Sequence, residues 1–209
     1  MRRQHEAVAH KDSGCDLNPV DHAGTLCAAT DRFRTVARGS ARLTSVERVF
    51  PDGAADERGV LTGFLDWQRA TVRRKVDGLP IELADRALMD TSPRMTIAGV
   101  VSHLRQTEYD WFAGSFPSLA DEPFDRDPNG GWSPVNGAIT DLLTAYEAEC
   151  AQSRRIISQL TLDTIQHFTP PQFAPVSVRW ILTHLIEETA RHLGHLDILR
   201  EHLDGTRGY

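Results

Sequence analysis

The sequence predicts an all-α fold, a four-helix bundle with long connecting loops and a poorly ordered N-terminal extension. Three observations support this fold class. Four segments carry apolar residues at helical spacing, no segment shows the regular alternation of a strand, and two long connections separate the helical segments. We expect the extension to cover residues 1–52 and the bundle to cover residues 53–209.

The extension has little sustained apolar periodicity and is rich in Gly, Ser, Asp, Arg and Thr. A segment of this composition cannot bury enough apolar surface to offset the entropy lost when its backbone is ordered. We therefore expect mostly irregular structure there, with at most a short helix near residues 41–49.

Three of the four expected helices have residues at one or both ends that favour a helix terminus. Thr96 and Ser177 are suitable N-caps, because their hydroxyls can accept hydrogen bonds from free backbone N–H groups. Gly78 and Gly205 follow the last apolar residues of the first and fourth segments, where glycine ends a helix readily. The expected helices lie at about residues 55–77, 96–113, 137–160 and 177–204.

The two long connections, residues 78–95 and 114–136, exclude a minimal up-down-up-down design. The second contains the run PFDRDPNGGWSP, in which three prolines and an Asn-Gly-Gly turn signal exclude regular structure. A loop of this length inside a compact domain is often functional.

The composition is that of an ordinary globular domain, with 209 residues, 40% hydrophobic and 25% charged. A net charge of -6 and a pI near 5.8 give no electrostatic reason to expect nucleic acid as a partner. No apolar run approaches the roughly 18 residues that cross a bilayer, so no membrane partner is expected. The first residues lack the apolar stretch of an export signal, so we expect a cytoplasmic protein.

The three cysteines, Cys15, Cys27 and Cys150, are few, odd in number and widely spaced. This pattern favours neither a disulfide framework nor a thiolate zinc site. Cys150 falls within a helical pattern, where a small core residue is the simplest interpretation. Ligand chemistry must therefore come from the nine histidines and the carboxylates.

The last helix carries a stripe of histidine and glutamate. His184, Glu188, His192 and His195 are four, four and three residues apart, so they return to nearly the same helix face. Burying such a stripe in a core costs free energy unless hydrogen bonds or a bound ion compensate its polar groups. Glu188 and His192, one turn apart, can place an oxygen and a nitrogen on one divalent metal ion.

A third ligand is needed from another helix, and His103 is the best candidate. It lies within a helix between apolar residues, whereas His5, His10 and His22 lie in the extension and His167 lies in a loop. His103, Glu188 and His192 would leave a fourth metal position open, as in catalytic sites. On the residues alone, an ordinary surface contact between Glu188 and His192 remains the alternative.

Two related metal sites are not supported by the spacing. Di-iron bundles carry Glu-x-x-His on two helices, whereas the expected bundle of this chain has Glu-x-x-x-His once, at Glu188 and His192. The His-Glu-x-x-His motif of zinc proteases is absent.

Four segments resemble the DinB-like superfamily, specifically its mycothiol transferase branch. The stretch SVRWILTHLIEETARHLGHLDILREHLDG is similar to the closing helix of that branch. FLDWQRATVRRKVDGL and MTIAGVVSHLRQTEYDWF resemble its first and second helices, and the loop ending in GGWSP with LTAYEAECAQSRRII resembles its third section. The resemblance covers about residues 56–205 and leaves the extension unmatched.

This resemblance implies a divalent metal, zinc (Zn) or nickel (Ni), held as in the similar mycothiol-dependent maleylpyruvate isomerases. The ligands carried over are His103, Glu188 and His192, with His195 in a supporting position. The fourth position would bind a low-molecular-weight thiol such as mycothiol as a thiolate, which attacks an electrophile. A homodimer is also implied.

Other functions remain open. A metal-dependent hydrolase or isomerase could use metal-bound water, and a metal-stabilised bundle could bind a small molecule without catalysis. The chain also departs from the family pattern at Leu193 and Leu196, which we expect to narrow the pocket. Arg191 and Arg200 are expected to be solvated on a charged helix.

Overall fold

Four α-helices form a bundle in the computed structural model, which describes residues 47–121, 124–167 and 174–208. Two short 3-10 helices lie in the connections, and the described residues contain no strand. The elements are α1 (Glu57–Val76), η1 (Ile81–Leu83), α2 (Ile97–Trp111), η2 (Pro117–Leu119), α3 (Ile139–Ser158) and α4 (Val178–Asp204). The predicted all-α, four-helix fold is confirmed.

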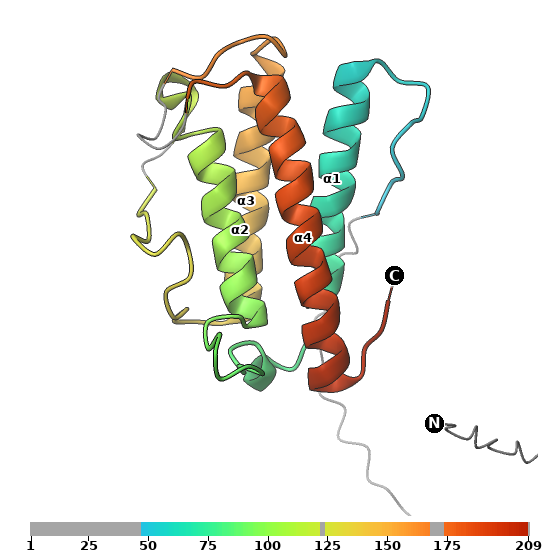
Figure 1. The fold of residues 1–209 in the computed structure, drawn as a ribbon, viewed down its shortest axis with the longest axis vertical. Coiled ribbons are helices and arrows are strands. Elements are labelled where there is room, and N and C mark those ends of the chain that lie inside the picture. Colours follow the sequence, from blue (N-terminus) through green and yellow to red (C-terminus); the bar gives the residue numbers. More distant parts are fainter. Residues whose placement is uncertain (1–46, 122–123, 168–173, 209) are drawn as a thin grey trace, which may run out of the picture. The chain divides into compact units, whose positions relative to one another are not determined.

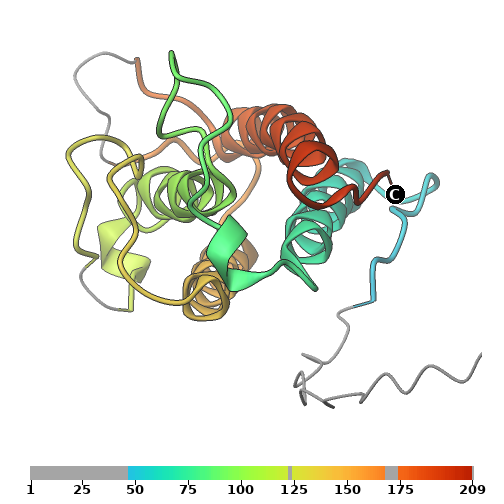
Figure 2. The same ribbon diagram turned by 90° about the horizontal axis from the view of Figure 1, so that it is seen from below.

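The helices form a ring in the order α1, α4, α2, α3 (Figure 2). Helix α1 packs extensively on α4 and α2 packs extensively on α3, whereas the α2/α4 and α1/α3 contacts are sparser. Helices α2 and α3 run in the same direction, so the connection between them returns along the side of the bundle (Figure 1). That return brings the loop around residues 127–133 beside α2.

The helix ends follow the predicted caps. Thr96 Oγ1 accepts a hydrogen bond from Gly99 N at 2.9 Å, and Ser177 Oγ accepts one from Trp180 N at 3.3 Å. Asp56 caps α1 by accepting from Gly59 N at 2.8 Å, so this helix begins at residue 57 rather than 55. Gly205 ends α4 with a left-handed φ of 76°.

The apolar core consists of two clusters along the bundle. One includes Val100, Leu104, Tyr146 and Cys150, and confirms Cys150 as a buried core residue. The other lies at the opposite end, around Leu65, Phe112, Phe116, Ile181 and Leu185. Leu193 and Leu196 pack in the first cluster. Their side chains contribute to the core, and the expectation that they narrow the pocket stays a prediction.

A buried ion pair crosses the bundle between α1 and α2. Arg69 Nε and Nη2 donate to the two carboxylate oxygens of Glu108 at 2.7 and 2.6 Å, and both side chains are 3% exposed. Arg69 Nη1 also donates to Asp66 Oδ1 at 2.8 Å. Burial alone would lower the pKa of Arg69, but the Glu108 carboxylate reverses this and raises it above the ordinary value. The charge of each partner is therefore balanced.

Arg200 joins the ends of α4 and α1. Its guanidinium donates to the backbone carbonyls of Lys75 and Asp77 and pairs with Asp204. Arg200 is buried, so the expectation of a solvated side chain is wrong. The last backbone carbonyls of a helix lack partners within the helix, and Arg200 donates hydrogen bonds to those at the end of α1. Arg191 is exposed, as expected.

The end of the extension contacts α1. Phe50 lies 5.8 Å from the ring of Trp67, and the Arg48 guanidinium lies 4.6 Å above the same ring. Most of the helix expected near residues 41–49 lies outside the described residues, and residues 47–49 are not helical. The division of the chain at residue 52 stays a proposal. No described helix is both long and apolar enough to cross a membrane.

Candidate metal centre

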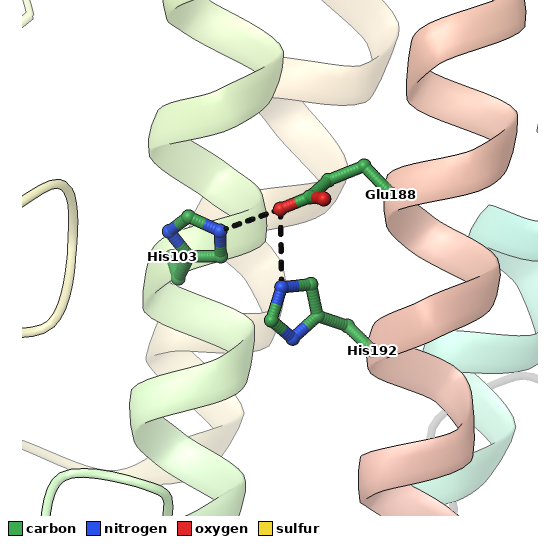
Figure 3. Close-up of side chains that lie close together, drawn as sticks. All are labelled: His103, Glu188 and His192. Atoms are coloured by element: carbon green, nitrogen blue, oxygen red, sulfur yellow. Dashed lines mark hydrogen bonds and ion pairs between the residues drawn. The ribbon is translucent and has the colours of Figure 1, made fainter.

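His103, Glu188 and His192 meet where α2 faces α4. His103 projects from the middle of α2, and the other two project from successive turns of α4 (Figure 3). Their donor atoms all lie within 4.8 Å of one another. Within the part of the chain that the structure describes, no other group of three His, Cys, Asp or Glu side chains converges in this way.

The spacing of the donor atoms suits a single divalent ion. His103 Nε2 lies 3.0 Å from Glu188 Oε1, and His192 Nε2 lies 3.1 Å from the same oxygen. Two ligands that bind zinc tetrahedrally with bonds of about 2.0–2.2 Å lie about 3.3 Å apart. Glu188 and each histidine therefore already lie at nearly the separation that an ion between them requires.

The loop after α2 orients His103. The Nδ1 atom of His103 lies 2.6 Å from the carbonyl oxygen of Gly130, which can only accept a hydrogen bond. Nδ1 therefore donates, and Nε2 of the same ring is directed at the Glu188 carboxylate. An imidazole nitrogen and a carboxylate oxygen at this distance can share a proton or bind one cation, so the donor set fits a metal ion.

Gln106 and Asp127 hold this loop against α2. Gln106 Nε2 donates to Asp127 O at 3.0 Å, and Asp127 N donates to Gln106 Oε1 at 2.9 Å. The Asp127 carboxylate in turn accepts hydrogen bonds from Asn129 and Ser133. Its small burial would raise the pKa of Asp127, but these hydrogen bonds outweigh it and lower the pKa to about 2. The loop is thus built around an ionised carboxylate.

Gly131 allows the loop to approach the helix backbone. Its φ is +83°, and a Cβ atom there would lie 2.6 Å from His103 Cα and 2.8 Å from Ser102 O. No real Cβ makes such contacts, so a side chain at residue 131 would push the loop away. The next residue, Trp132, stacks on the His103 ring with centroids 4.5 Å apart.

The buried end of the site is His192. Burial, followed by the neighbouring His103, lowers the pKa of His192 to about 4, which leaves a neutral imidazole at neutral pH. For Glu188, burial would raise the pKa, but the hydrogen bond from His103 and the nearby His192 lower it. The site therefore offers the Glu188 carboxylate and the neutral imidazole of His192, with His103 Nε2 beside the same carboxylate oxygen.

The predicted stripe on α4 divides into two parts. His195 Nδ1 lies 3.2 Å from His192 Nδ1, so it can hydrogen-bond the side of the ring that faces away from Glu188. His184 instead contacts Trp111 and Trp180, with ring centroids 4.8 and 5.1 Å away. His184 is therefore an aromatic packing residue outside the site.

Sequence reasoning missed the residues that support His103. Gln106, Asp127, Gly130 and Trp132 carry no recognisable metal-site spacing, and the long connection only indicated a functional loop. The usable signal was the Asn-Gly-Gly turn, because consecutive glycines also permit a close backbone approach.

One comparison with known proteins identifies a family. The family model for mycothiol-S-transferase matches residues 60–205, a range that includes all four helices except the first three residues of α1. The match contains His103, Glu188 and His192 and the loop that supports His103. No curated protein matches the chain. The chain belongs to the mycothiol-S-transferase family.

Proposed function

We propose that the chain is a metal-dependent S-transferase that moves a low-molecular-weight thiol, mycothiol or a close analogue, onto an electrophile. One observation carries the proposal: two imidazole Nε2 atoms converge on one oxygen of Glu188 in a chain of the mycothiol-S-transferase family. His103, Glu188 and His192 are the proposed ligands of a divalent ion, zinc or nickel. Imidazole nitrogens and a carboxylate suit both metals.

Three side chains provide three donors and leave a position for a substrate. A divalent ion bound there lowers the pKa of a coordinated thiol, which supplies thiolate at neutral pH. Glu188 contributes the negative charge, and its other oxygen, Oε2, lies 3.4 Å from Arg191 Nη1. This contact holds the carboxylate with Oε1 directed at the two histidines.

The remaining residues of the site position the ligands. The Gly130 carbonyl accepts a hydrogen bond from His103 Nδ1, and Trp132 stacks on the same ring. These contacts keep His103 Nε2 directed at Glu188. We propose the same role for His195 toward His192. Supporting contacts of this kind usually change metal affinity or activity by about 10–100-fold when they are removed.

Metal analysis of purified variants tests the site. We expect about one equivalent of divalent metal in the wild type and in His184→Ala, and a large loss in His103→Ala and His192→Ala. His184→Ala is the matched control, because it removes an α4 histidine that lies outside the site. Equal metal in all four proteins would overturn the proposed site.

A second measurement tests the reaction. The metal-loaded wild type should consume an electrophile such as monochlorobimane in the presence of mycothiol, with saturation in the thiol. His103→Ala should lower this rate by at least about 100-fold, since one lost metal ligand removes several kcal/mol of stabilisation. Stoichiometric metal without thiol binding would favour metal-bound water chemistry or a binding function. The homodimer and the cytoplasmic location stay predictions.

A further inference from the structure

A cavity of about 610 Å³ lies beside the candidate metal centre, between the loop before α2 and the second half of α4. We call it the α4 groove. Its apolar wall consists of Leu88, Met89, Met95, Ile198 and Leu199. Cavities of about 300–1,000 Å³ bind small organic molecules, so the α4 groove has room for a substrate.

The α4 groove reaches the metal centre through His195. This side chain lines the groove, and its Nδ1 lies 3.2 Å from Nδ1 of the proposed ligand His192. Met95 lines both the groove and a smaller, more open cavity of about 280 Å³. Trp132, which stacks on His103, lines that smaller cavity. The α4 groove is thus one side chain, His195, away from the proposed ligand His192.

The wall of the α4 groove is mostly apolar. None of its eight residues is Asp, Glu, Lys or Arg, and its polar side chains are those of Ser92, His195 and His202. A carboxylate or phosphate bound there would lose water without gaining an arginine or lysine partner. The two methionines, with unbranched and polarisable side chains, can adapt to apolar molecules of different shape. The wall therefore favours an apolar, uncharged occupant.

We propose that the α4 groove binds the electrophile, and that this substrate is apolar and uncharged. The inference rests on the proposed S-transferase function and names the class of its second substrate. With a primary alkyl chloride, the thiol sulfur forms a bond to the carbon as the carbon–chlorine bond breaks. Chloride leaves with the bonding electrons, and the thiol proton passes to water.

Binding can be tested without turnover, because the chain has only three methionines and two of them line the groove. The probes are toluene and 4-methylbenzoate, observed through the NMR signals of ¹³C-methyl methionine in the full-length protein. Met89→Leu assigns one signal. We expect toluene to shift the Met89 and Met95 signals and 4-methylbenzoate to leave them unchanged. No shift with toluene, or equal shifts with both, would overturn the proposal.

Kinetics with the matching reactive pair, benzyl chloride and 4-(chloromethyl)benzoate, test specificity. With mycothiol and metal-loaded protein, kcat/KM should be at least about tenfold higher for benzyl chloride, since the carboxylate would lose hydration in the groove. Ile198→Arg should lower kcat/KM for benzyl chloride by about tenfold and raise it for the carboxylate. Ile198 is 60% exposed, so the variant should fold. Ile165→Arg, at a 51% exposed isoleucine in the α3–α4 connection, is the matched control and should behave as wild type.

The NMR titration and the kinetics distinguish an error in the proposed groove from an error in the proposed S-transferase reaction. Toluene binding without turnover of either chloride would leave the groove assigned and overturn S-transfer. Turnover of both chlorides at equal rates would leave S-transfer standing and overturn the groove. Sedimentation tests another occupant: a wild-type dimer that Ile198→Arg converts to a monomer would show that a second copy covers the groove, and would overturn the proposal.

Discussion

Two polar clusters inside the bundle differ in the groups that face their buried carboxylate. The Arg69–Glu108 pair spans α1 and α2, and its guanidinium donates to both carboxylate oxygens. The cluster of His103, Glu188 and His192 joins α2 to α4, and its carboxylate faces two imidazole nitrogens. The first cluster contains its own arginine cation, whereas the second surrounds one carboxylate oxygen with two imidazole nitrogens.

This difference supports a structural role for the first cluster and the proposed metal binding for the second. A buried ion pair whose charges are balanced has little affinity for a further ligand. Two imidazole nitrogens and a carboxylate oxygen directed at one point are suitable ligands for a divalent cation. The supporting contacts of His103 are the second distinction, because the Gln106–Asp127 loop orients that ring from behind.

Removing one partner of the buried ion pair should have the largest effect on stability. Glu108→Ala leaves the Arg69 charge buried with only Asp66, which should lower the free energy of unfolding by about 3–5 kcal/mol. Urea denaturation measures this loss. The double variant Arg69→Met/Glu108→Leu should lose less than Glu108→Ala, because no unpaired charge remains. A loss below about 1 kcal/mol in Glu108→Ala would contradict a structural role for the pair.

Adding metal should have the next largest effect and should act only through the second cluster. A ligand at 100 times its Kd stabilises the folded state by about 2.7 kcal/mol. We expect this gain in urea denaturation with zinc or nickel against a chelator, and we expect it to vanish in Glu188→Ala. Glu147→Ala, which removes an α3 carboxylate that pairs with Arg73 instead of with the site, is the control and should retain the gain. An equal gain in Glu188→Ala would place the metal elsewhere.

The sequence predicted the fold because its signals are local. Thr96, Ser177 and Gly205 act within one turn of the helix ends that they define, and apolar residues three or four apart define the core face. The error came from a tertiary contact. Nothing local to Arg200 indicates that it reaches the carbonyls at the end of α1.

The site was predictable to the extent that its residues share a helix. Glu188 and His192 follow from i,i+4 spacing, whereas their meeting with His103 depends on how α2 lies against α4. The loop contacts are harder still to predict from the sequence. Gly130 reaches His103 because Gly131 lies so close to α2 that a Cβ atom would not fit, and residue spacing does not indicate this approach.

Displacing the loop behind His103 should weaken metal binding without removing a ligand. Gly131→Ala places a Cβ against the His103 backbone, so the Gly130 carbonyl must retreat from Nδ1. We expect metal affinity to fall by about 10–100-fold, as for other supporting contacts of metal ligands. Calorimetric titration with zinc measures this fall. Gly78→Ala is the matched control, since Gly78 has a similar φ of +69° but open space around its Cβ position. Its metal affinity should equal that of the wild type.

The smallest effect should come from the charge of Asp127 and should depend on pH. Hydrogen bonds lower the pKa of Asp127 to about 2 in the folded protein, against about 3.9 in an unfolded chain. A lowered carboxyl pKa contributes stability that is fully present above the unfolded pKa and is lost as the pH falls through the folded pKa. Urea denaturation should therefore show wild type more stable than Asp127→Asn at pH 6, with the difference shrinking between about pH 4 and 2. A stability difference that does not change with pH would mean that the negative charge of Asp127 does not contribute to stability. The loop would then differ from the Arg69–Glu108 cluster, in which a charged carboxylate is part of the structure.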